Sequence, residues 1–261
     1  MKQKLTEIVG WNAVLAALEN KDVVVSRLYI ADTRGSDARR QKACALAKEY
    51  GIPIEMSSRE NMDTRWGREH QGVAAESTHN AALMVSSEDD LEELLEQEDT
   101  IVENGVTRSI PKLILILDGI QDPHNLGACL RTAGAAKVCC VIAPKDKSAS
   151  LTPAARKVAC GAAETVPFIQ VTNLARTMKL LKSLGIWIYG LDQEADNSIY
   201  DVKFSGNIAI VMGSEEHGMR RLTIENCDDV LKIPMLGSME SLNVSVASGI
   251  ALFSVRQSQN R

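Results

Sequence analysis

Long apolar runs are absent from the sequence: none approaches the roughly 20 residues that a membrane-spanning helix requires. The first residues also lack the apolar core and small-residue cleavage site of a secretory leader, so we expect neither a membrane span nor a signal peptide. The six cysteines form no C-x-x-C pair and have no Cys/His ligand spacing. We therefore expect reduced, mostly buried thiols in a cytoplasmic protein, with no metal site.

Common nucleotide and nucleophile motifs are missing as well. The chain has no Walker phosphate loop, no G-x-G-x-x-G and no G-x-S-x-G elbow. This argues against the usual phosphate-cradle, dinucleotide and serine-hydrolase interpretations. What is present is ordinary for a folded protein: 261 residues, of which 45% are apolar and 24% charged. This composition excludes disorder, collagen and coiled coil as global descriptions.

The net charge of −5 is unevenly distributed. Residues 81–112 hold 9 acidic and 2 basic side chains, whereas residues 1–80 and residues 113–261 each have a net charge of +1. The middle stretch is typical of a solvated acidic helix or a mobile linker. Because the flanking blocks are nearly neutral and can carry local basic surfaces, the global charge does not exclude a nucleic-acid partner.

The pattern predicts two α/β units joined by the acidic stretch. Residues 1–80 mix helical and β-branched segments and predict a small α/β unit. Residues 81–112 would be an acidic linker. Over 113–261, buried strands alternate with helices, which predicts a mostly parallel sheet covered on both faces, a doubly wound pattern. Helices are expected near 5–19, 36–50, 125–136, 152–160, 173–184 and 243–257, and strands near 23–31, 52–58, 70–77, 112–120, 138–144, 165–171, 186–191, 207–213 and 230–235.

Three loops that follow predicted strands are rich in Gly, Pro, Asn and Ser, and ligands of open parallel sheets bind beyond the carboxyl ends of strands. The first covers residues 117–133. Asn125 lies near a helix start, Gly127 permits close approach of another group, and Arg131 comes six residues after Asn125. An Asn125 just outside the helix could converge with Arg131. A helix cap and a surface arginine are the simpler interpretation.

The second loop covers residues 210–221, where an apolar strand ends at Gly213 and is followed by Glu215 and Gly218. Its backbone amides could bind a nucleotide-like ligand, and Glu215 could accept a hydrogen bond from a hydroxyl or an amine. An ordinary strand-to-helix turn is the simpler alternative.

The third loop covers residues 233–253. Ile233 ends a strand, and Ser241, Leu242 and Asn243 lead into the last helix, whose small residues allow another group to pack closely. Ser241 or Asn243 as a helix cap is the simpler alternative.

Together the three loops resemble the SpoU/TrmH family of knotted RNA 2′-O-ribose methyltransferases. The family motifs N-x-G-x-x-x-R, G-S/A-E-G-x-G and I-P-M-x-G-x-x-x-S-L-N-V-S-V-A have counterparts at residues 125–131, 213–218 and 233–247. Segments such as DPHNLGACLRTA and KVACGAAETVP are similar to family members that methylate a guanosine ribose in large-subunit rRNA. The N-terminal unit resembles their RNA-binding domain at residues 10–18 and 70–72.

The resemblance implies S-adenosylmethionine as cofactor, large-subunit ribosomal RNA as partner, a deep trefoil knot in the C-terminal unit and a homodimer. Backbone at Gly213, Ile233 and Leu242 would hold the cofactor. Arg131 is implied to be essential, either as a base or as an anchor for a phosphate or the developing alkoxide. A guanidinium is a poor base because its pKa lies above about 12. The other implied site residues, which would orient Arg131 and the ribose, are Asn125, Glu215, Ser241 and Asn243.

Two other functions stay open from the sequence. One changes only the substrate, to tRNA. The other is a non-catalytic RNA-binding or ribosome-assembly factor that kept the fold. Only Glu216 favours the latter: it stands where the second family motif has glycine, and a side chain is disfavoured there if φ is positive. His124 is an alternative base, and His217 is expected to be a solvated loop residue.

Overall fold

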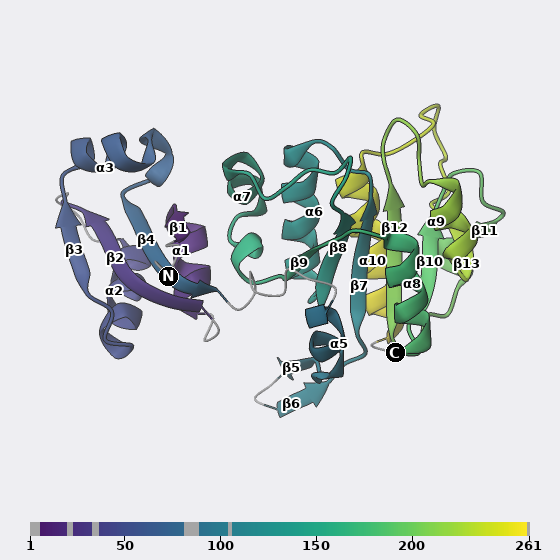
Figure 1. Cartoon of the computed structure of the whole chain (residues 1–261), viewed down its shortest axis with the longest axis horizontal. Helices are drawn as coiled ribbons and strands as arrows, with labels where there is room; N and C mark the ends of the chain where they lie inside the picture. The colour runs from purple at the N-terminus through teal and green to yellow at the C-terminus, as the bar shows by residue number, and fades with distance from the viewer. Residues whose placement is uncertain (1–5, 20–22, 33–36, 81–88, 104–105, 260–261) are drawn as a thin grey trace. The chain divides into compact units, whose positions relative to one another are not determined.

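A computed structural model describes residues 6–19, 23–32, 37–80, 89–103 and 106–259. The chain divides into two compact units, residues 1–84 with 160–165 and residues 85–159 with 166–261 (Figure 1). None of the described helices is long and apolar enough to cross a membrane.

The first unit contains a four-stranded sheet in the order β1-β4-β2-β3. Its elements are β1 (Thr6–Val9), α1 (Trp11–Glu19), β2 (Val23–Ala31), α2 (Ala38–Glu49), β3 (Ile54–Ser57), α3 (Arg59–Trp66), the 3₁₀ turn η1 (Arg68–His70), β4 (Val73–Asn80) and the 3₁₀ turn η2 (Ala162–Glu164). β4 pairs antiparallel with β1 and β2, and β3 lies parallel to β2. Apolar residues of α1 and α2 share a core with one face of this sheet, whereas α3 packs on the other face through Met62 and Trp66.

The turn before β4 is fixed by buried polar contacts. His70 is fully buried; its Nδ1 accepts a hydrogen bond from the Gly72 amide over 2.8 Å, and its Nε2 lies 2.8 Å from an Asp63 carboxylate oxygen. Because Nδ1 accepts, the ring hydrogen of the neutral imidazole is on Nε2 and donates to Asp63. Trp11 Nε1 also donates to the Gln71 carbonyl over 2.9 Å. The bend expected at Gly72 is confirmed, with φ of +87° at that residue.

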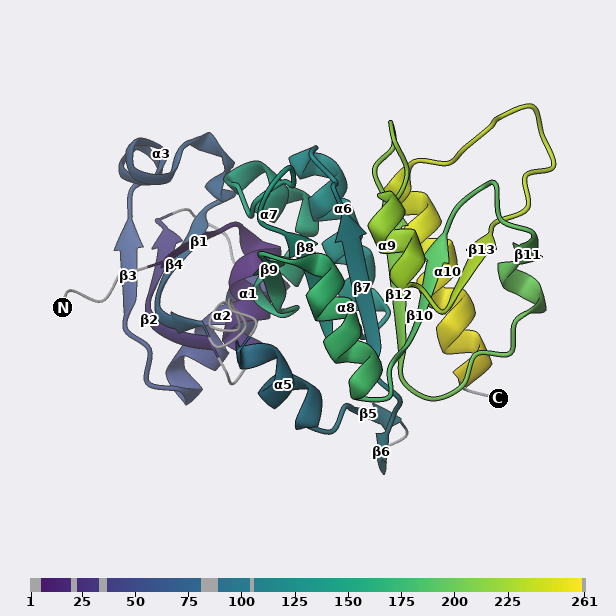
Figure 2. The same cartoon turned by 45° about the vertical axis from the view of Figure 1, so that its right-hand side comes forward.

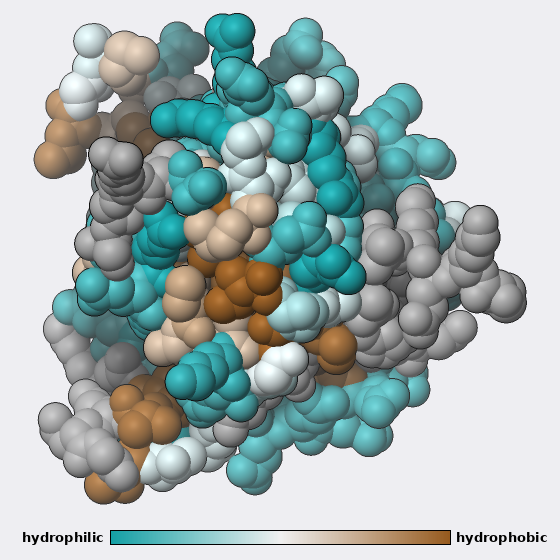
Figure 3. Space-filling view, turned by 90° about the vertical axis from the view of Figure 1, so that its left-hand side faces the viewer, coloured by the Kyte–Doolittle hydropathy of each residue, from teal (hydrophilic) through white to brown (hydrophobic). Residues whose placement is uncertain are grey.

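Strand β3 is the exposed edge of the first unit. Its side chains Ile54 and Met56 are exposed. Figure 3 views the molecule from the side on which β3 lies and shows apolar side chains gathered there among hydrophilic ones. Isolated exposed apolar side chains are normal on a protein surface, so this feature alone assigns no function.

The second unit contains a seven-stranded sheet in the order β11-β13-β10-β12-β7-β8-β9, in which every neighbouring pair is parallel. Its strands are β7 (Leu113–Asp118), β8 (Cys140–Pro144), β9 (Phe168–Val171), β10 (Trp187–Leu191), β11 (Asn197–Ser198), β12 (Ile208–Gly213) and β13 (Asp229–Lys232). Its helices are α5 (Asp89–Glu96), α6 (Pro123–Ala135), α7 (Pro153–Ala159), α8 (Leu174–Ser183), the 3₁₀ turn η3 (Ile199–Asp201), α9 (Arg221–Asn226) and α10 (Val244–Gln259). The mostly parallel C-terminal sheet expected from the sequence is confirmed.

Helices cover both faces of this sheet, which explains the continuous apolar run of β7. Ile114 and Ile116 share a core cluster with α5 and α8. On the opposite face α6 and α10 pack against each other (Figure 1), and Figure 2 shows α8 in front of the strands with α10 behind them. The amino-terminal ends of both α6 and α10 lie at the carboxyl edge of the strands.

A buried arginine holds α10 in place. Arg256 donates hydrogen bonds to the carbonyls of Ala136 over 2.8 Å, Pro111 over 2.7 Å and Lys137 over 2.6 Å. Burial lowers the pKa of the Arg256 guanidinium, and the three carbonyls compensate for the lost hydration. The C-terminal helix is thereby tied to the start of β7 and the end of α6.

The acidic stretch 81–112 contains regular structure as well as charge. The described part includes α5 and a hairpin of β5 (Thr100–Glu103) and β6 (Val106–Ser109). Leu91 and Leu95 of α5 are buried in the core of the second unit, so this helix belongs to that fold. Its Glu92, Glu93 and Glu96 side chains are exposed. Residues 81–88, at the start of the stretch, lie outside the described residues.

Candidate active site

The second unit brings two of the three loops together at the carboxyl edge of its central strands. β7 and β12 are neighbours in parallel register, and their last residues, Asp118 and Gly213, pair directly. The loops that follow these strands therefore start side by side. In open parallel sheets this edge is where ligands bind.

The loop after β12 folds back tightly on its strand. Ser214 and Gly218 exchange two backbone hydrogen bonds, of 3.0 and 2.9 Å. A Cβ atom on Gly213 would lie 2.1 Å from the Gly218 carbonyl carbon, so only glycine fits there. Gly218 has a φ of +63°, whereas Glu216 is not among the residues with positive φ. Glu216 is therefore accommodated without backbone strain.

Asn243 acts as a helix cap and also holds two other motifs. Its Oδ1 accepts hydrogen bonds from the amide and the hydroxyl of Ser245, over 2.9 and 2.5 Å, at the start of α10. This fixes the orientation of the side-chain amide. Its Nδ2 then donates to Asn125 Oδ1 over 3.0 Å and to Glu215 Oε1 over 2.7 Å. The sequence allows Asn243 to be a helix cap or a site residue, and the structure shows both: the amide oxygen caps α10, and the amide nitrogen contacts Asn125 and Glu215.

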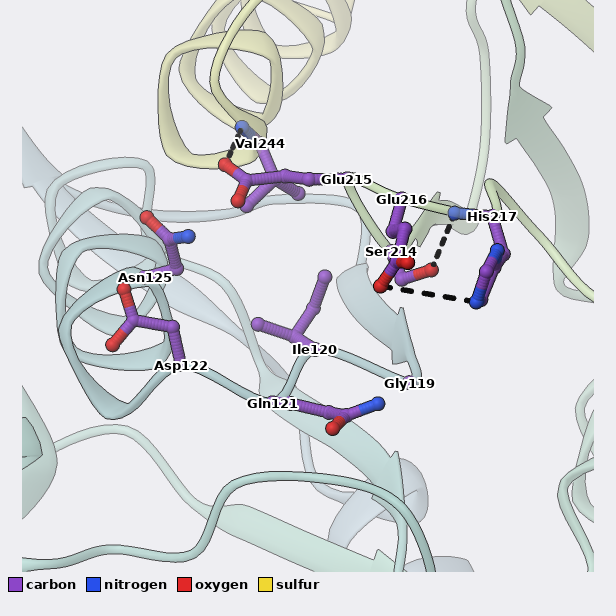
Figure 4. Close-up of a pocket in the computed structure, with 10 residues that line it drawn as sticks. All are labelled: Gly119, Ile120, Gln121, Asp122, Asn125, Ser214, Glu215, Glu216, His217 and Val244. Carbon is purple, nitrogen blue, oxygen red and sulfur yellow. Dashed lines mark hydrogen bonds and ion pairs between the residues drawn. The ribbon is translucent and has the colours of Figure 1, made fainter.

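Glu215 faces the first turn of α10. The Val244 amide lies 3.4 Å from Glu215 Oε1, and Figure 4 shows this side chain extended from its loop towards Val244 and Asn125. The helix N-terminus, with its unsatisfied amides, favours a carboxylate at this place. The cavity beside it is lined by Gly119, Ile120, Gln121, Asp122, Asn125, Ser214, Glu215, Glu216, His217 and Val244.

The histidines near the cavity make few contacts. His217 is exposed, as expected, and its Nε2 lies 3.8 Å from a Glu216 carboxylate oxygen. His124 is exposed in the first turn of α6 and is not among the residues that line the cavity. Neither histidine is held by a hydrogen bond from its ring to a described residue, as an oriented general base would be.

On α6 the structure separates Asn125 from Arg131. The N-cap is Asp122, whose side chain accepts a hydrogen bond from the His124 amide, and Asn125 is the third residue of the helix rather than a residue outside it. Six residues of helix correspond to a rotation of about 600°. Asn125 and Arg131 therefore do not share a face of α6, and the alternative of an Asn125 outside the helix does not apply.

Arg131 and Ser241 are not brought into the hydrogen-bonded group. Both are exposed, and neither forms a hydrogen bond or ion pair with another side chain of the described residues. Gly127 does allow a close approach: a Cβ there would lie 2.4 Å from the Ala155 carbonyl oxygen of α7. The group that approaches this glycine is thus the neighbouring helix, which leaves no room for a ligand.

The residues implied in cofactor binding lie at the ends of β12 and β13 and before α10. Ile233 is buried, and Leu242 and Gly213 are half-buried. The segment from residue 234 to 242 forms no backbone–backbone hydrogen bond with the described residues. Leu236 in this segment is 100% exposed. Free amides, free carbonyls and apolar side chains in one loop are groups that can bind an adenosine moiety.

Two buried contacts behind the site had no signal in the sequence. Asp118, at the end of β7, is bonded to Arg220, which lies 102 residues further along the chain. Cys129 of α6 lies 3.6 Å from the Ser248 hydroxyl of α10. Burial raises the pKa of Cys129 to about 11, so this thiol packs the two helices together in its neutral form. Within the described ranges, no group of three or more His, Cys, Asp or Glu residues is arranged to hold a metal ion.

Comparison with known proteins identifies the family. Residues 112–253 match the SpoU rRNA Methylase family, and residues 8–81 match a domain described as RNA 2'-O ribose methyltransferase substrate binding. The chain is 48% identical to the 23S rRNA (guanosine-2'-O-)-methyltransferase RlmB of Pseudomonas putida, over 98% of both chains. It is 45% identical to the protein of the same name from Coxiella burnetii, over 97% of this chain and 96% of the relative.

Solved structures with lower sequence identity share the fold. The SpoU methyltransferase AviRb from Streptomyces viridochromogenes, in complex with the cofactor AdoMet, has a TM-score of 0.74 at 21% identity and covers 97% of this chain and 90% of its own. An AdoMet-bound rRNA methyltransferase from Sinorhizobium meliloti has a TM-score of 0.71 at 19% identity, over 97% of this chain and 87% of its own. With the family match over more than half of the residues, the conclusion is plain: this chain belongs to the SpoU rRNA methylase family.

Proposed function

We propose that this chain transfers a methyl group from S-adenosylmethionine to the 2′-oxygen of a guanosine ribose in 23S rRNA. The observation that carries the proposal is the meeting of Asn125, Glu215 and Asn243, one from each of the three motifs, at the carboxyl edge of the parallel sheet. The near-full-length identity to proteins named as 23S rRNA guanosine methyltransferases supports the substrate.

Methyl transfer to a ribose hydroxyl requires alignment and removal of a proton. When bound, S-adenosylmethionine supplies an electrophilic methyl group on a sulfonium. Glu215 uses Oε1 to hold Asn243 and Val244, and its Oε2 has no partner among the described residues. That oxygen can accept a hydrogen bond from the ribose, while Asn243, which also donates to Asn125, holds the carboxylate in place. Ser241, two residues before Asn243, is the further group that we assign to orienting the ribose.

We assign Arg131 to stabilising negative charge, either on an RNA phosphate or on the alkoxide that develops during the reaction. It is exposed on α6 and is therefore free to contact RNA. Its guanidinium, with a pKa above about 12, is suited to binding a phosphate or stabilising an alkoxide rather than to taking a proton, so the hydroxyl proton would leave through a phosphate or water. The separation of Arg131 from Asn125 on the helix is consistent with a site that the RNA, or a second copy of the chain, completes.

The residues present fit the cofactor. Backbone at Gly213, Ile233 and Leu242 would hold it, with the unbonded amides and carbonyls of residues 234–242 available for the adenine and the apolar Leu236 available to cover it. These groups bind by hydrogen bonds and apolar contact, as nucleoside sites do. No metal is assigned a part in this reaction.

We also propose the organisation that the family implies. Residues 1–80 would bind the RNA substrate, residues 113–261 would hold the cofactor in a knotted fold, and residues 81–112 would join them. A homodimer is supported by Val246 and Phe253, which are exposed apolar residues two helical turns apart on α10. The protein would act in the cytoplasm, where ribosomal RNA is found.

The test is to separate cofactor binding from substrate choice. Calorimetry with S-adenosylmethionine should show binding, and the protein should then methylate 23S rRNA but not tRNA when each is supplied alone. Absence of cofactor binding would favour a non-catalytic RNA-binding factor. Binding of S-adenosylmethionine together with methylation of tRNA only would show that the substrate is tRNA and would contradict the proposal.

A further inference from the structure

Asp118 is a charged residue at a place where unpaired charges are costly. It is the last residue of β7, follows five apolar residues, and has 0% of its side chain exposed. All hydrogen bonds that its carboxylate forms with the described residues come from Arg220. The Arg220 amide donates to Oδ2 over 2.9 Å, Nε donates to Oδ1 over 2.7 Å, and Nη2 lies 2.5 Å from Oδ1. Because a buried carboxylate needs a partner, these contacts hold Arg220 in one position.

The end of β7 also fixes the loop that lies between Gly213 and Arg220. Gly213 pairs with Asp118 in the sheet, and Arg220 returns to the Asp118 carboxylate. Between them, the Ser214–Gly218 hydrogen bonds close the loop on itself. The loop therefore leaves and returns beside a single residue, and its backbone has little freedom to shift.

Glu215 projects from this loop and depends on it for its position. Its hydrogen bond to Asn243 lies at the surface, where contacts between exposed groups are individually weak, and the Val244 amide is 3.4 Å away, which is long for a hydrogen bond. They cannot by themselves hold the carboxylate against a displaced backbone. The rigid part of the arrangement is the buried Asp118 carboxylate with its partner Arg220.

We propose that Asp118 and Arg220 are positioning residues for methyl transfer, which hold the Ser214–Gly218 loop so that the Glu215 carboxylate faces Asn243. This inference rests on the proposed function. It adds that the rate depends on the geometry of the Asp118–Arg220 pair, which does not itself touch the ribose, and that this dependence passes through Glu215.

Arg220→Lys is the first variant, because lysine keeps the charge but loses the planar guanidinium whose Nε and Nη2 both contact Asp118 Oδ1. Arg220 is half-exposed, so the substitution leaves no cavity in the core. With the full chain, saturating S-adenosylmethionine and 23S rRNA, we expect a loss of about tenfold in the single-turnover rate, since displacements of about 1 Å cost up to about 100-fold. The apparent affinity for RNA and the thermal unfolding midpoint should stay near those of the wild type.

Arg221→Lys is the matched control. Arg221 is the next residue, is 91% exposed and pairs only with Glu225 on the surface of α9 among the described residues. Its substitution should leave the single-turnover rate unchanged. Asp118→Asn is the second test variant, because asparagine keeps the size and one acceptor oxygen but loses the charge, and it should lose rate as Arg220→Lys does.

A double-mutant cycle with Glu215→Ala distinguishes positioning from general stabilisation. If the pair acts through Glu215, Arg220→Lys should lower the rate by less than about twofold once Glu215 is absent, because coupled residues are not additive. Equal losses in both backgrounds, or no loss for Arg220→Lys in the wild type, would overturn the inference while leaving the site intact. An unchanged rate for Glu215→Ala alone would instead contradict the proposed site and the inference together.

Discussion

Replacing Asn243 with aspartate turns its hydrogen bond to Glu215 into a repulsion between two carboxylates and leaves the helix cap intact. Aspartate caps a helix about as well as asparagine, so the bond from the Ser245 amide should persist and α10 should still begin at Val244. The amide nitrogen that donates to Glu215 and Asn125 becomes a carboxylate oxygen. Asn125 can turn its own amide to donate to the new oxygen, but Glu215 cannot.

The size of the effect follows from the 2.7 Å separation between Asn243 Nδ2 and Glu215 Oε1. Losing a charge-assisted hydrogen bond at an exposed site costs about 1 kcal/mol. Two unit charges at this separation in water-like surroundings repel by about 1.5 kcal/mol. If the whole loss falls on the transition state, about 2.5 kcal/mol corresponds to a decrease of about 70-fold in the methylation rate.

The assay is single-turnover methylation of 23S rRNA, with thermal unfolding as a control for folding. Adding Glu215→Gln to Asn243→Asp should restore much of the rate, because the glutamine amide can donate to the new carboxylate and re-form the pair with reversed polarity. Glu215→Gln alone keeps an acceptor oxygen for Asn243 but presents an amide nitrogen to the ribose, so it should lose part of the rate. If the double variant is no better than Asn243→Asp, the hydrogen bond between the second and third motifs is not what places Glu215.

Further predictions concern the arginine, the first unit and the RNA. Arg131→Ala should abolish methyl transfer with little change in the unfolding midpoint, because Arg131 is exposed; turnover at the wild-type rate would remove it from the mechanism. Deletion of residues 1–80 should spare S-adenosylmethionine binding, measured by calorimetry, and cut rRNA methylation; loss of both would refute the division of roles. RNA affinity should fall with salt despite the net charge of −5, with a log–log slope of about −3 to −6. A flat dependence would mean that the chain does not bind an RNA backbone.

The sequence predicts best those helices and strands whose residue pattern fits only one type of secondary structure. The apolar run of β7 is buried on both faces, and strand β2 has the bounds expected from its β-branched residues. Helix α3 gave no signal because only Met62 of its residues is buried, so it has no apolar period to recognise. Helix α5 was hidden for another reason: the charges of the acidic stretch outweighed the spacing of Leu91 and Leu95, which are four residues apart on one buried face.

The site was predictable where it depends on motif residues and not where it depends on distant pairs. That Asn125, Glu215 and Asn243 meet could be expected because all three lie in loops that follow predicted strands, and ligands of open parallel sheets bind at the carboxyl ends of strands. Whether Asn243 caps a helix or joins the site could not be decided from the sequence, because one amide does both. The bond of Asp118 to Arg220 joins residues 102 positions apart, and neither has a local pattern that marks it as paired.

The most direct test of the central claim is mass mapping of 23S rRNA from cells that lack this chain. We expect the loss of one methyl group from the ribose of a guanosine, its return when the wild-type chain is supplied, and no return with Arg131→Ala. Unchanged 23S rRNA in the deletion strain, or a methyl group lost from tRNA instead, would contradict that claim.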